Sequence, residues 1–393
     1  MKKTIFISLF LLTSLTQAYS QELEEFVIGT KHHIYSHVLE EDRSYWLSLP
    51  ESYHTPFSSY KKYPVLIILD GNTLFRHISG MVDFMSSETY RNQRIPEMIV
   101  VAVENVNRNR DFTPDKIITR RPNDFGGGDN FLRFLEEELI PQLDQEYRTA
   151  PYRILYGHSL GGLLATHTYM KESTLFNAFI AADPSLGSWG AETMDQKLEK
   201  LTQNSFDRFI YIATANWGKR NIRNRDRHVR LYESFHAKSE GEFPGELEYF
   251  EEENHALVPS IAFYKGISSV FEGYGIDYRD IQNVEQLKKH FSILSDRLSY
   301  QFLPPESLVN QLGYSFLRSN DEIGKRKAIE FFQLNTENYP ESYNAYDSLG
   351  EALEGIGDTE NAIKNYQRSI EINPDNSHAS DRIAVLKSSK NLN

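Results

Sequence analysis

The sequence predicts an α/β protein: a doubly wound, mostly parallel sheet followed by a small all-α tail. Three observations point to this architecture. Short, mostly apolar runs recur between residues 63 and 250, and such runs are typical of strands buried on both faces. Helical patterns lie between these runs, and strands that alternate with helices form parallel sheets. Beyond residue 275 the patterns are helical throughout.

The central strands are expected at 63–69, 98–103, 153–156, 178–182 and 209–213, and the last strand at 247–250. Residues 26–49 predict two antiparallel strands joined at residues 40–43, because their side chains alternate. The clearest helix covers residues 130–147, where apolar side chains recur at helical spacing. A helix over residues 264–271 closes this part of the chain. In such sheets, ligands bind beyond the carboxyl ends of the strands.

The tail contains a repeat at an offset of 34 residues. Three positions of the first copy match the second: Ala328, Phe332 and Pro340 correspond to Ala362, Tyr366 and Pro374. The pattern resembles tetratricopeptide repeats, helix pairs that bury their faces only by stacking on neighbours, and the alternative is an undistinguished helical tail. We expect a first domain over residues 21–275, a helical linker over 276–305 and the repeats over 306–393, docked on the first domain.

Residues 1–20 predict an export signal, because two lysines precede an apolar run that is too short to span a membrane. Small residues at Ala18 and Ser20 fit a cleavage site. No later segment is apolar enough to span a membrane. The sequence contains no cysteine, which excludes disulfides, thiolate metal sites and a cysteine nucleophile. We expect an exported protein, periplasmic or secreted.

The formal net charge of −13 argues against nucleic acid as a partner, because phosphate binding needs a basic face. Two segments nevertheless concentrate basic residues, 104–121 and 218–230, and both are expected at the active-site edge of the sheet. They form either a solvated surface or a region that attracts an anionic substrate. Trp189 and Trp217 could stack on aromatic rings of that substrate. The candidate substrate-binding residues are therefore Arg108, Arg110, Trp189, Trp217 and Arg223.

The segment Gly157-His158-Ser159-Leu160-Gly161 follows a strand and precedes a helix. This arrangement predicts a sharp turn that holds Ser159 in a strained conformation, which requires residues without a Cβ two positions before and after it. The helix that follows directs its N–H groups and the positive end of its dipole toward the serine. A Gly-x-Ser-x-Gly pattern also occurs by chance, but the strand and helix around it favour a nucleophile.

A serine nucleophile needs a base, and the base needs a third group to hold it. His255 is the expected base, because it lies in a turn after the last strand; His228 and His236 fall in a predicted helix, and His158 shapes the turn. The expected acid is Asp226, the carboxylate in the loop after the strand that ends near residues 213–215. Glu233 and Glu253 are alternatives, and a backbone carbonyl could replace the acid.

The oxyanion hole should consist of two backbone N–H groups. The first is that of Leu160, directly after the serine. The second should follow the strand at 63–69, and Asn72 is the expected donor.

Residues 27–272 resemble an esterase family that includes esterase D-like enzymes, feruloyl and acetyl-xylan esterases, and enterobactin and bacillibactin esterases. The stretches that carry the resemblance are 69–72, 107–114, 126–128, 131–134, 138–141, 157–162 and 183–186. The resemblance implies an α/β-hydrolase fold without metal or cofactor, with Ser159 as nucleophile and His255 as base. The family's loop often carries a carboxylate soon after the strand, whereas here residues 216–220 intervene without one.

We expect an exported serine carboxylesterase that acts on a small-molecule ester through an acyl-enzyme at Ser159. The substrate is expected to be a ferric siderophore or another anionic aromatic ester. One alternative is an esterase that releases acetyl or feruloyl groups from polysaccharides. Another is a non-catalytic interaction protein that binds a protein partner through its helical repeats.

Overall fold

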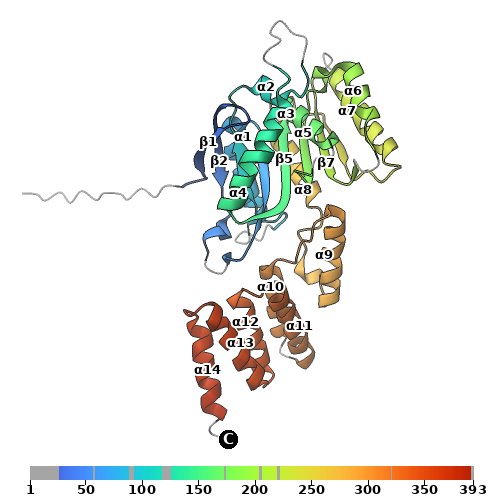
Figure 1. The fold of residues 1–393 in the computed structure, drawn as a ribbon. Coiled ribbons are helices and arrows are strands. Elements are labelled where there is room, and N and C mark those ends of the chain that lie inside the picture. Colours follow the sequence, from blue (N-terminus) through green and yellow to red (C-terminus); the bar gives the residue numbers. More distant parts are fainter. Residues whose placement is uncertain are drawn as a thin grey trace, which may run out of the picture.

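The computed structural model describes residues 26–55, 58–87, 93–116, 125–171, 174–202, 206–218, 222–319 and 321–390 (Figure 1). The expected export signal at residues 1–20 lies outside these ranges. In the described chain the strands form one eight-stranded sheet in the order β1-β2-β4-β3-β5-β6-β7-β8. The strands are β1 Thr30–Ser36, β2 Glu41–Ser48, β3 Tyr63–Ile68, β4 Ile99–Val103, β5 Thr149–His158, β6 Ala178–Ala182, β7 Phe209–Ala215 and β8 Glu246–Phe250.

The sheet is mostly parallel, as the sequence predicts. β1 pairs antiparallel with β2, and β2 pairs antiparallel with β4. The remaining neighbours, from β4 through β8, are parallel. The carboxyl ends of β3, β5, β6 and β7 therefore meet at one edge of the sheet. In open α/β sheets, ligands bind at this edge.

Helices cover both faces of the sheet because alternate residues of each strand point to opposite faces. In β3, Leu66 and Ile68 pack in a core with α1 (Gly71–Ser86) and α8 (Val258–Val270). Val65 and Ile67 pack on the other face. The helices of that face are α2 Arg108–Phe112, α3 Gly128–Phe134, α4 Ile140–Glu146, α5 Leu160–Met170, α6 Gly190–Glu199 and α7 Ile222–Lys238. The layers of a doubly wound fold are thus confirmed.

The helix expected at 130–147 is built from three consecutive pieces. A π-helical segment, Leu135–Leu139, joins α3 to α4. Within it, the Glu138 carboxylate accepts hydrogen bonds from the hydroxyl of Ser36 and from the backbone N–H groups of His37 and Val38. Because those residues form the turn after β1, Glu138 ties the antiparallel hairpin to the parallel part of the fold.

The region after α8 is helical and lies at one end of the sheet (Figure 1). Its helices are α9 Val284–Leu298, α10 Glu306–Leu317, α11 Glu322–Asn338, α12 Tyr343–Gly355, α13 Thr359–Ile372 and α14 Ser377–Lys390. Phe291 of α9, Leu312 of α10 and Phe331 of α11 belong to the same core as α1 and α8. The described helices α12–α14 pack around a separate small core with the other side of α11.

The matched positions of the 34-residue repeat occupy equivalent places in two helix pairs. Ala328 and Ala362 are both fully buried, as are Phe332 and Tyr366. A Cβ on Gly313 would lie 2.5 Å from the ring of Phe332, and one on Gly350 would lie 2.8 Å from the ring of Tyr366. Each pair, α10 with α11 and α12 with α13, therefore packs an aromatic ring against a glycine of its partner helix.

Candidate active site

Ser159 lies at the sharp turn between β5 and α5. Its backbone has φ 60° and ψ −114°, a strained conformation for a residue with a side chain. A Cβ on Gly157 would lie 2.2 Å from the carbonyl oxygen of Gly161, so this position requires glycine. A Cβ on Gly161 would lie 3.3 Å from Leu69 Cβ, which is tight but not excluded. The need for glycine is therefore much stricter before the serine than after it.

His255 reaches Ser159 from the turn between β8 and α8. Its Nε2 lies 3.1 Å from Ser159 Oγ. The side chain of Asn254 accepts hydrogen bonds from the backbone N–H groups of Ala256 and Leu257, which holds this turn. Ser159 Oγ also lies 3.1 Å from the hydroxyl of Ser185. The structure thus brings together the serine and the histidine that the sequence indicates.

The carboxylate beside His255 is Asp183. Its Oδ2 lies 2.5 Å from His255 Nδ1. Asp183 follows β6 directly, has a left-handed backbone with φ 43°, and is fully buried. Three further donors approach the carboxylate: the indole N–H of Trp217 at 2.6 Å, the backbone N–H of Ala215 at 3.2 Å and the amide of Asn224 at 3.3 Å. A buried carboxylate needs such partners, and this one is well supplied.

The pKa of Asp183 reflects two opposing effects. Burial alone would raise it, because a low-dielectric environment disfavours the charged form. The hydrogen bond from His255, the neighbouring His228 and the other N–H donors outweigh burial and hold the pKa below its usual value. Asp183 is therefore ionised at neutral pH, so His255 carries its proton on Nδ1 and presents Nε2 to the serine as an acceptor.

The expected acid, Asp226, does not take this position. Asp226 and Glu233 are exposed on α7, and Glu253 contributes its backbone carbonyl, which accepts the N–H of Asn216. The sequence argument expected the acid after the strand that became β7, whereas the carboxylate that contacts His255 follows β6. β6 is the direct neighbour of β5 in the sheet, so a residue just past its end lies beside the serine turn. An aspartate directly after a buried strand was the signal in the sequence.

His228 supports the segment that carries Asp183. It is fully buried, and its Nε2 lies 2.7 Å from the carbonyl oxygen of Pro184, to which it must donate. Its Nδ1 therefore accepts the hydroxyl hydrogen of Thr214, at 2.9 Å. Burial lowers the pKa of His228, which is consistent with this neutral form. His228 thus connects the ends of β6 and β7 beneath the site.

The ring of His255 lies between two other rings. The ring centroids of His158 and Trp217 are each 4.4 Å from that of His255. Burial, together with the nearby His255, lowers the pKa of His158 to about 4, so His158 is neutral at ordinary pH. Trp217 is 40% exposed, and its indole N–H is directed to Asp183. Trp217, expected to stack on substrate, therefore contacts both His255 and Asp183.

Trp189 does not take its expected place. It is 6% exposed and packs in the core beneath α6, with the Lys197 ammonium 5.2 Å from its ring centroid. A side chain buried in this way cannot stack on a substrate. The sequence pattern did not reveal that α6 and the helices beside it would cover this ring.

The expected substrate-binding arginines differ in how they are engaged. Arg108 forms a two-pronged ion pair with Asp70, at 2.5 and 2.9 Å, and also donates to the carbonyl oxygen of His158. Arg110 is bound to Glu41 and Asp111, which ties α2 to β2. Arg223 is exposed at the start of α7 and has no ion-pair partner within the described residues. Arg223 is thus available to an anionic ligand, whereas Arg110 is held in ion pairs that stabilise the fold.

Both candidate oxyanion donors lie at helix starts on the active-site edge. Leu160 is the first residue of α5, and Asn72 is the second residue of α1. The first N–H groups of a helix have no acceptor within it, so they remain available. Asp70 turns the chain from β3 into α1 with a left-handed φ of 59°, and its carboxylate is held by Arg108 and Asn105. This network fixes the start of α1 next to the serine turn.

Within the described residues, no group of three or more histidine, aspartate or glutamate side chains is arranged to hold a metal ion. In the same part of the chain, no helix is both long and apolar enough to cross a membrane.

The chain is similar to known esterases. Residues 36–228 match the sequence profile of the family described as "Putative esterase". The ferri-bacillibactin esterase BesA of Bacillus subtilis is 28% identical over 240 residues, which cover 56% of this chain and 81% of BesA. The apo-salmochelin esterase of Escherichia coli is 29% identical over 159 residues. That match covers 36% of this chain and 46% of the relative, so it spans less than half of that enzyme.

The fold of this chain is also similar to those of solved structures. An IroE-like serine hydrolase from Shewanella oneidensis superimposes with a TM-score of 0.69 at 25% identity, covering 79% of this chain and 99% of that one. An uncharacterised protein from Capnocytophaga ochracea has a TM-score of 0.59 at 19% identity and covers 92% of this chain and 99% of its own. The second likeness concerns the fold alone, and its coverage extends into the helical tail. Residues 36–228 thus carry the sequence pattern of the "Putative esterase" family, and the chain is an ester-hydrolysing enzyme with an α/β-hydrolase fold.

Proposed function

We propose that Ser159, His255 and Asp183 form a catalytic triad that hydrolyses esters through an acyl-enzyme. One observation carries the proposal: an unbroken chain of contacts runs from Ser159 Oγ to His255 Nε2 at 3.1 Å and from His255 Nδ1 to Asp183 Oδ2 at 2.5 Å. These are the distances over which a hydroxyl proton can pass to an imidazole that a carboxylate holds.

In the first half of the reaction, Ser159 Oγ attacks the ester carbonyl carbon while His255 Nε2 accepts the hydroxyl proton. The ionised carboxylate of Asp183 stabilises the resulting imidazolium. Negative charge develops on the former carbonyl oxygen, and the N–H groups of Leu160 and Asn72 are the proposed donors to it. The tetrahedral intermediate collapses when His255 gives its proton to the leaving alkoxide, and the acyl group remains on Ser159.

In the second half, water takes the place of the alcohol. His255 accepts a proton from the water as its oxygen attacks the acyl carbon, and a second tetrahedral intermediate forms. Its collapse releases the carboxylic acid and returns the proton to Ser159 Oγ. The catalyst is regenerated without a metal ion or cofactor taking part.

The proposed substrate is an ester of the siderophore class, or another anionic aromatic ester. The printed activities of two relatives, a ferri-bacillibactin esterase and an apo-salmochelin esterase, support this class. The exposed Arg223 at the start of α7 supports it as well, since a guanidinium without an ion-pair partner among the described residues would attract a negative ligand. Arg225 is less available to a ligand, because its guanidinium lies 3.8 Å from the ring centroid of Tyr249.

We further propose that the protein is exported, with residues 1–20 as its signal and a mature chain that begins near residue 21. The lysines and the short apolar run of this segment support export. The proposed division places the esterase domain at residues 21–275, a helical linker at 276–305 and the repeats at 306–393. In this proposal the repeats bind a protein partner in addition to packing on the first domain.

The decisive experiment measures hydrolysis of a short p-nitrophenyl ester, a feruloyl ester and a ferric trilactone siderophore by the native enzyme and by Ser159→Ala. We expect the trilactone to be preferred and Ser159→Ala to lose at least about 1,000-fold in kcat. Ser185→Ala is the matched control, since it removes a neighbouring hydroxyl but not the nucleophile. A fluorophosphonate should label Ser159 in the native enzyme. Undiminished turnover by Ser159→Ala would refute the triad.

A further inference from the structure

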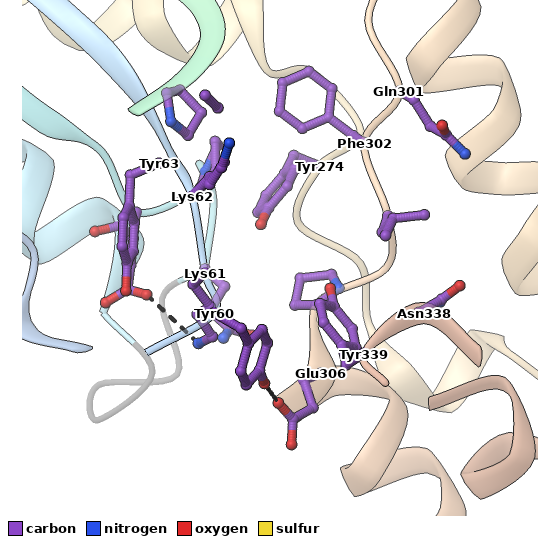
Figure 2. A pocket seen from close by; sticks show the side chains of 18 of the residues that line it. Tyr60, Lys61, Lys62, Tyr63, Tyr274, Gln301, Phe302, Glu306, Asn338 and Tyr339 are labelled. Carbon is purple, nitrogen blue, oxygen red and sulfur yellow. Dashed lines mark hydrogen bonds and ion pairs between the residues drawn. The ribbon is translucent and has the colours of Figure 1, made fainter. Parts of the chain in front are cut away.

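A cavity distant from Ser159 lies where the helical tail meets the sheet (Figure 2). Its volume is about 430 Å³, within the range of small-molecule sites. Tyr63 at the start of β3 and Ala150 at the start of β5 line its sheet side. Because β5 runs from this cavity to the serine turn at about 3.3 Å per residue, the two sites are roughly 25–30 Å apart. A ligand here cannot reach Ser159.

The walls of this junction cavity are rich in aromatic rings. They are Tyr60, Tyr63, Tyr274, Tyr300, Phe302 and Tyr339. Tyr60 and Tyr339 pack across the junction, with ring centroids 5.9 Å apart, and on the tail side the rings of Tyr300 and Phe302 have centroids 4.9 Å apart. Flat, partly apolar walls of this kind suit a ligand with an aromatic ring.

The polar groups that remain available in the junction cavity are mainly donors. Lys61 and Lys62 line the sheet side, and Tyr274 and Tyr339 line the opposite wall (Figure 2). Lys62 has no ion-pair partner within the described residues, and Lys61 Nζ lies a long 3.9 Å from Glu97. The Asn338 side-chain Nδ2 is buried and has no hydrogen-bond partner in the described chain.

The acids of the junction cavity are mostly engaged. Glu306 accepts hydrogen bonds from Ser342, Asn344 and Tyr60. Glu97 accepts both the hydroxyl and the backbone N–H of Ser52. Glu341 lies at the exposed rim. An anion that enters between the lysines and the aromatic wall therefore meets the ammonium of Lys62 and the amide of Asn338, while Glu97 and Glu306 already accept hydrogen bonds.

The parts of the chain around the junction cavity are held in place, so the site is preformed. The side chain of Gln93 donates to Ser307, and the phenol of Tyr339 donates to the carbonyl oxygen of Pro304. Arg297 of α9 donates to three backbone carbonyls at the end of α8: those of Ser269, Val270 and Glu272. A preformed site loses little free energy to ordering when a ligand binds.

We propose that the junction cavity binds a small aromatic carboxylate, with the carboxylate at Lys61 and Lys62 and the ring against the aromatic wall. The proposal does not depend on the triad. Benzoate is the probe, and calorimetry should give a dissociation constant on the order of 0.1–1 mM. Benzamide, which lacks the charge, and cyclohexanecarboxylate, which lacks the aromatic ring, should each bind more weakly. Because the ligand bridges the sheet and the tail, benzoate at ten times this constant should raise Tm by about 2–4 °C.

Two variants test the placement. Lys62→Met keeps the apolar stem but removes the charge and should weaken benzoate binding about fivefold to tenfold. Leu303→Trp, at a partly exposed position on the wall, should fill the cavity and abolish binding. Both should keep esterase activity, and Lys265→Met, on the surface of α8, is the matched control. The proposal is overturned if native protein does not bind benzoate at 5 mM (about 5–50 times the expected constant), or if both variants bind normally. It is also overturned if Trp217→Ala, at the catalytic site, abolishes binding instead.

Discussion

The carboxylate of Asp183 receives four donors while being fully buried, which makes it the residue on which the imidazole depends. Asp183→Asn would present an amide to His255 Nδ1 and favour the wrong tautomer, in which Nε2 carries the proton. We expect kcat to fall about 1,000-fold with little change in KM. Asp226→Asn, on the exposed face of α7, is the control and should stay within about twofold of the native rate. Comparable losses in both variants would contradict the assignment.

The same residue predicts a pH dependence of stability. In the folded protein the pKa of Asp183 lies below its value in the unfolded chain, which is about 3.9, despite burial. At pH values above about 3.9 the ionised carboxylate therefore stabilises the folded state. The contribution is lost as pH falls through the folded pKa. Native protein should therefore lose more free energy of unfolding than Asp183→Asn as pH is lowered from 5 toward 3. Urea titrations at several pH values measure this, and parallel curves for the two proteins would argue against it.

Trp217 distinguishes two roles that the sequence alone could not separate. If it holds Asp183 and His255 in place, Trp217→Phe keeps a ring beside His255 but loses the N–H donor to Asp183. We then expect kcat to drop about fivefold to twentyfold, because hydrogen bonds to charged groups contribute about 1.5–3 kcal/mol when buried and less at a partly exposed position. KM should change little. A rise in KM with unchanged kcat would instead show that the ring binds substrate.

At the scale of elements, the turn between β5 and α5 depends on Gly157 more than on Gly161. A Cβ at Gly157 would collide with backbone, whereas one at Gly161 would lie 3.3 Å from Leu69 Cβ, so a displacement of a few tenths of an ångström would make room for it. Gly157→Ala should cost about 2–3 kcal/mol of stability and most of the activity. Gly161→Ala should cost about 1 kcal/mol or less and retain activity within about tenfold. Thermal unfolding and kcat/KM of both variants test this, and equal effects would show that the turn is less constrained than its geometry indicates.

The sequence predicted those elements whose signal is local. Ser159 sits in a motif bounded by a strand and a helix, and His255 follows the last strand, so both could be found by inspection. Asp183 could not be assigned in the same way, because its role depends on which strand end lies next to the serine turn. That neighbour is set by the order β5-β6-β7, a property of the assembled sheet. The burial of Trp189 beneath α6 is likewise a consequence of packing between distant segments.

At the scale of the whole molecule, the tail is part of two different cores. Side chains of α9, α10 and α11 pack in the same core as α1 and α8, and Tyr152 at the base of β5 lies 5.2 Å from the ring of Phe302. The described residues of α12–α14 pack instead around α11. The 34-residue repeat predicts stacked helix pairs but does not predict this division, since periodicity describes how helices pair and not which outer face meets the sheet.

The division leads to a prediction about truncation. Ending the chain after residue 275 would expose the apolar side chains that α9–α11 cover. The free energy of unfolding falls by about 25 cal/mol for each Å² of apolar surface returned to water. We expect this fragment to aggregate. Ending the chain after Glu341 removes only α12–α14, so it should leave a folded enzyme with near-native kcat/KM and a Tm lower by about 4–8 °C. Light scattering, circular dichroism and esterase assays compare the two. A monomeric, fully active fragment 21–275 would show that the sheet does not need α9–α11, and the shared core would then contribute little to folding.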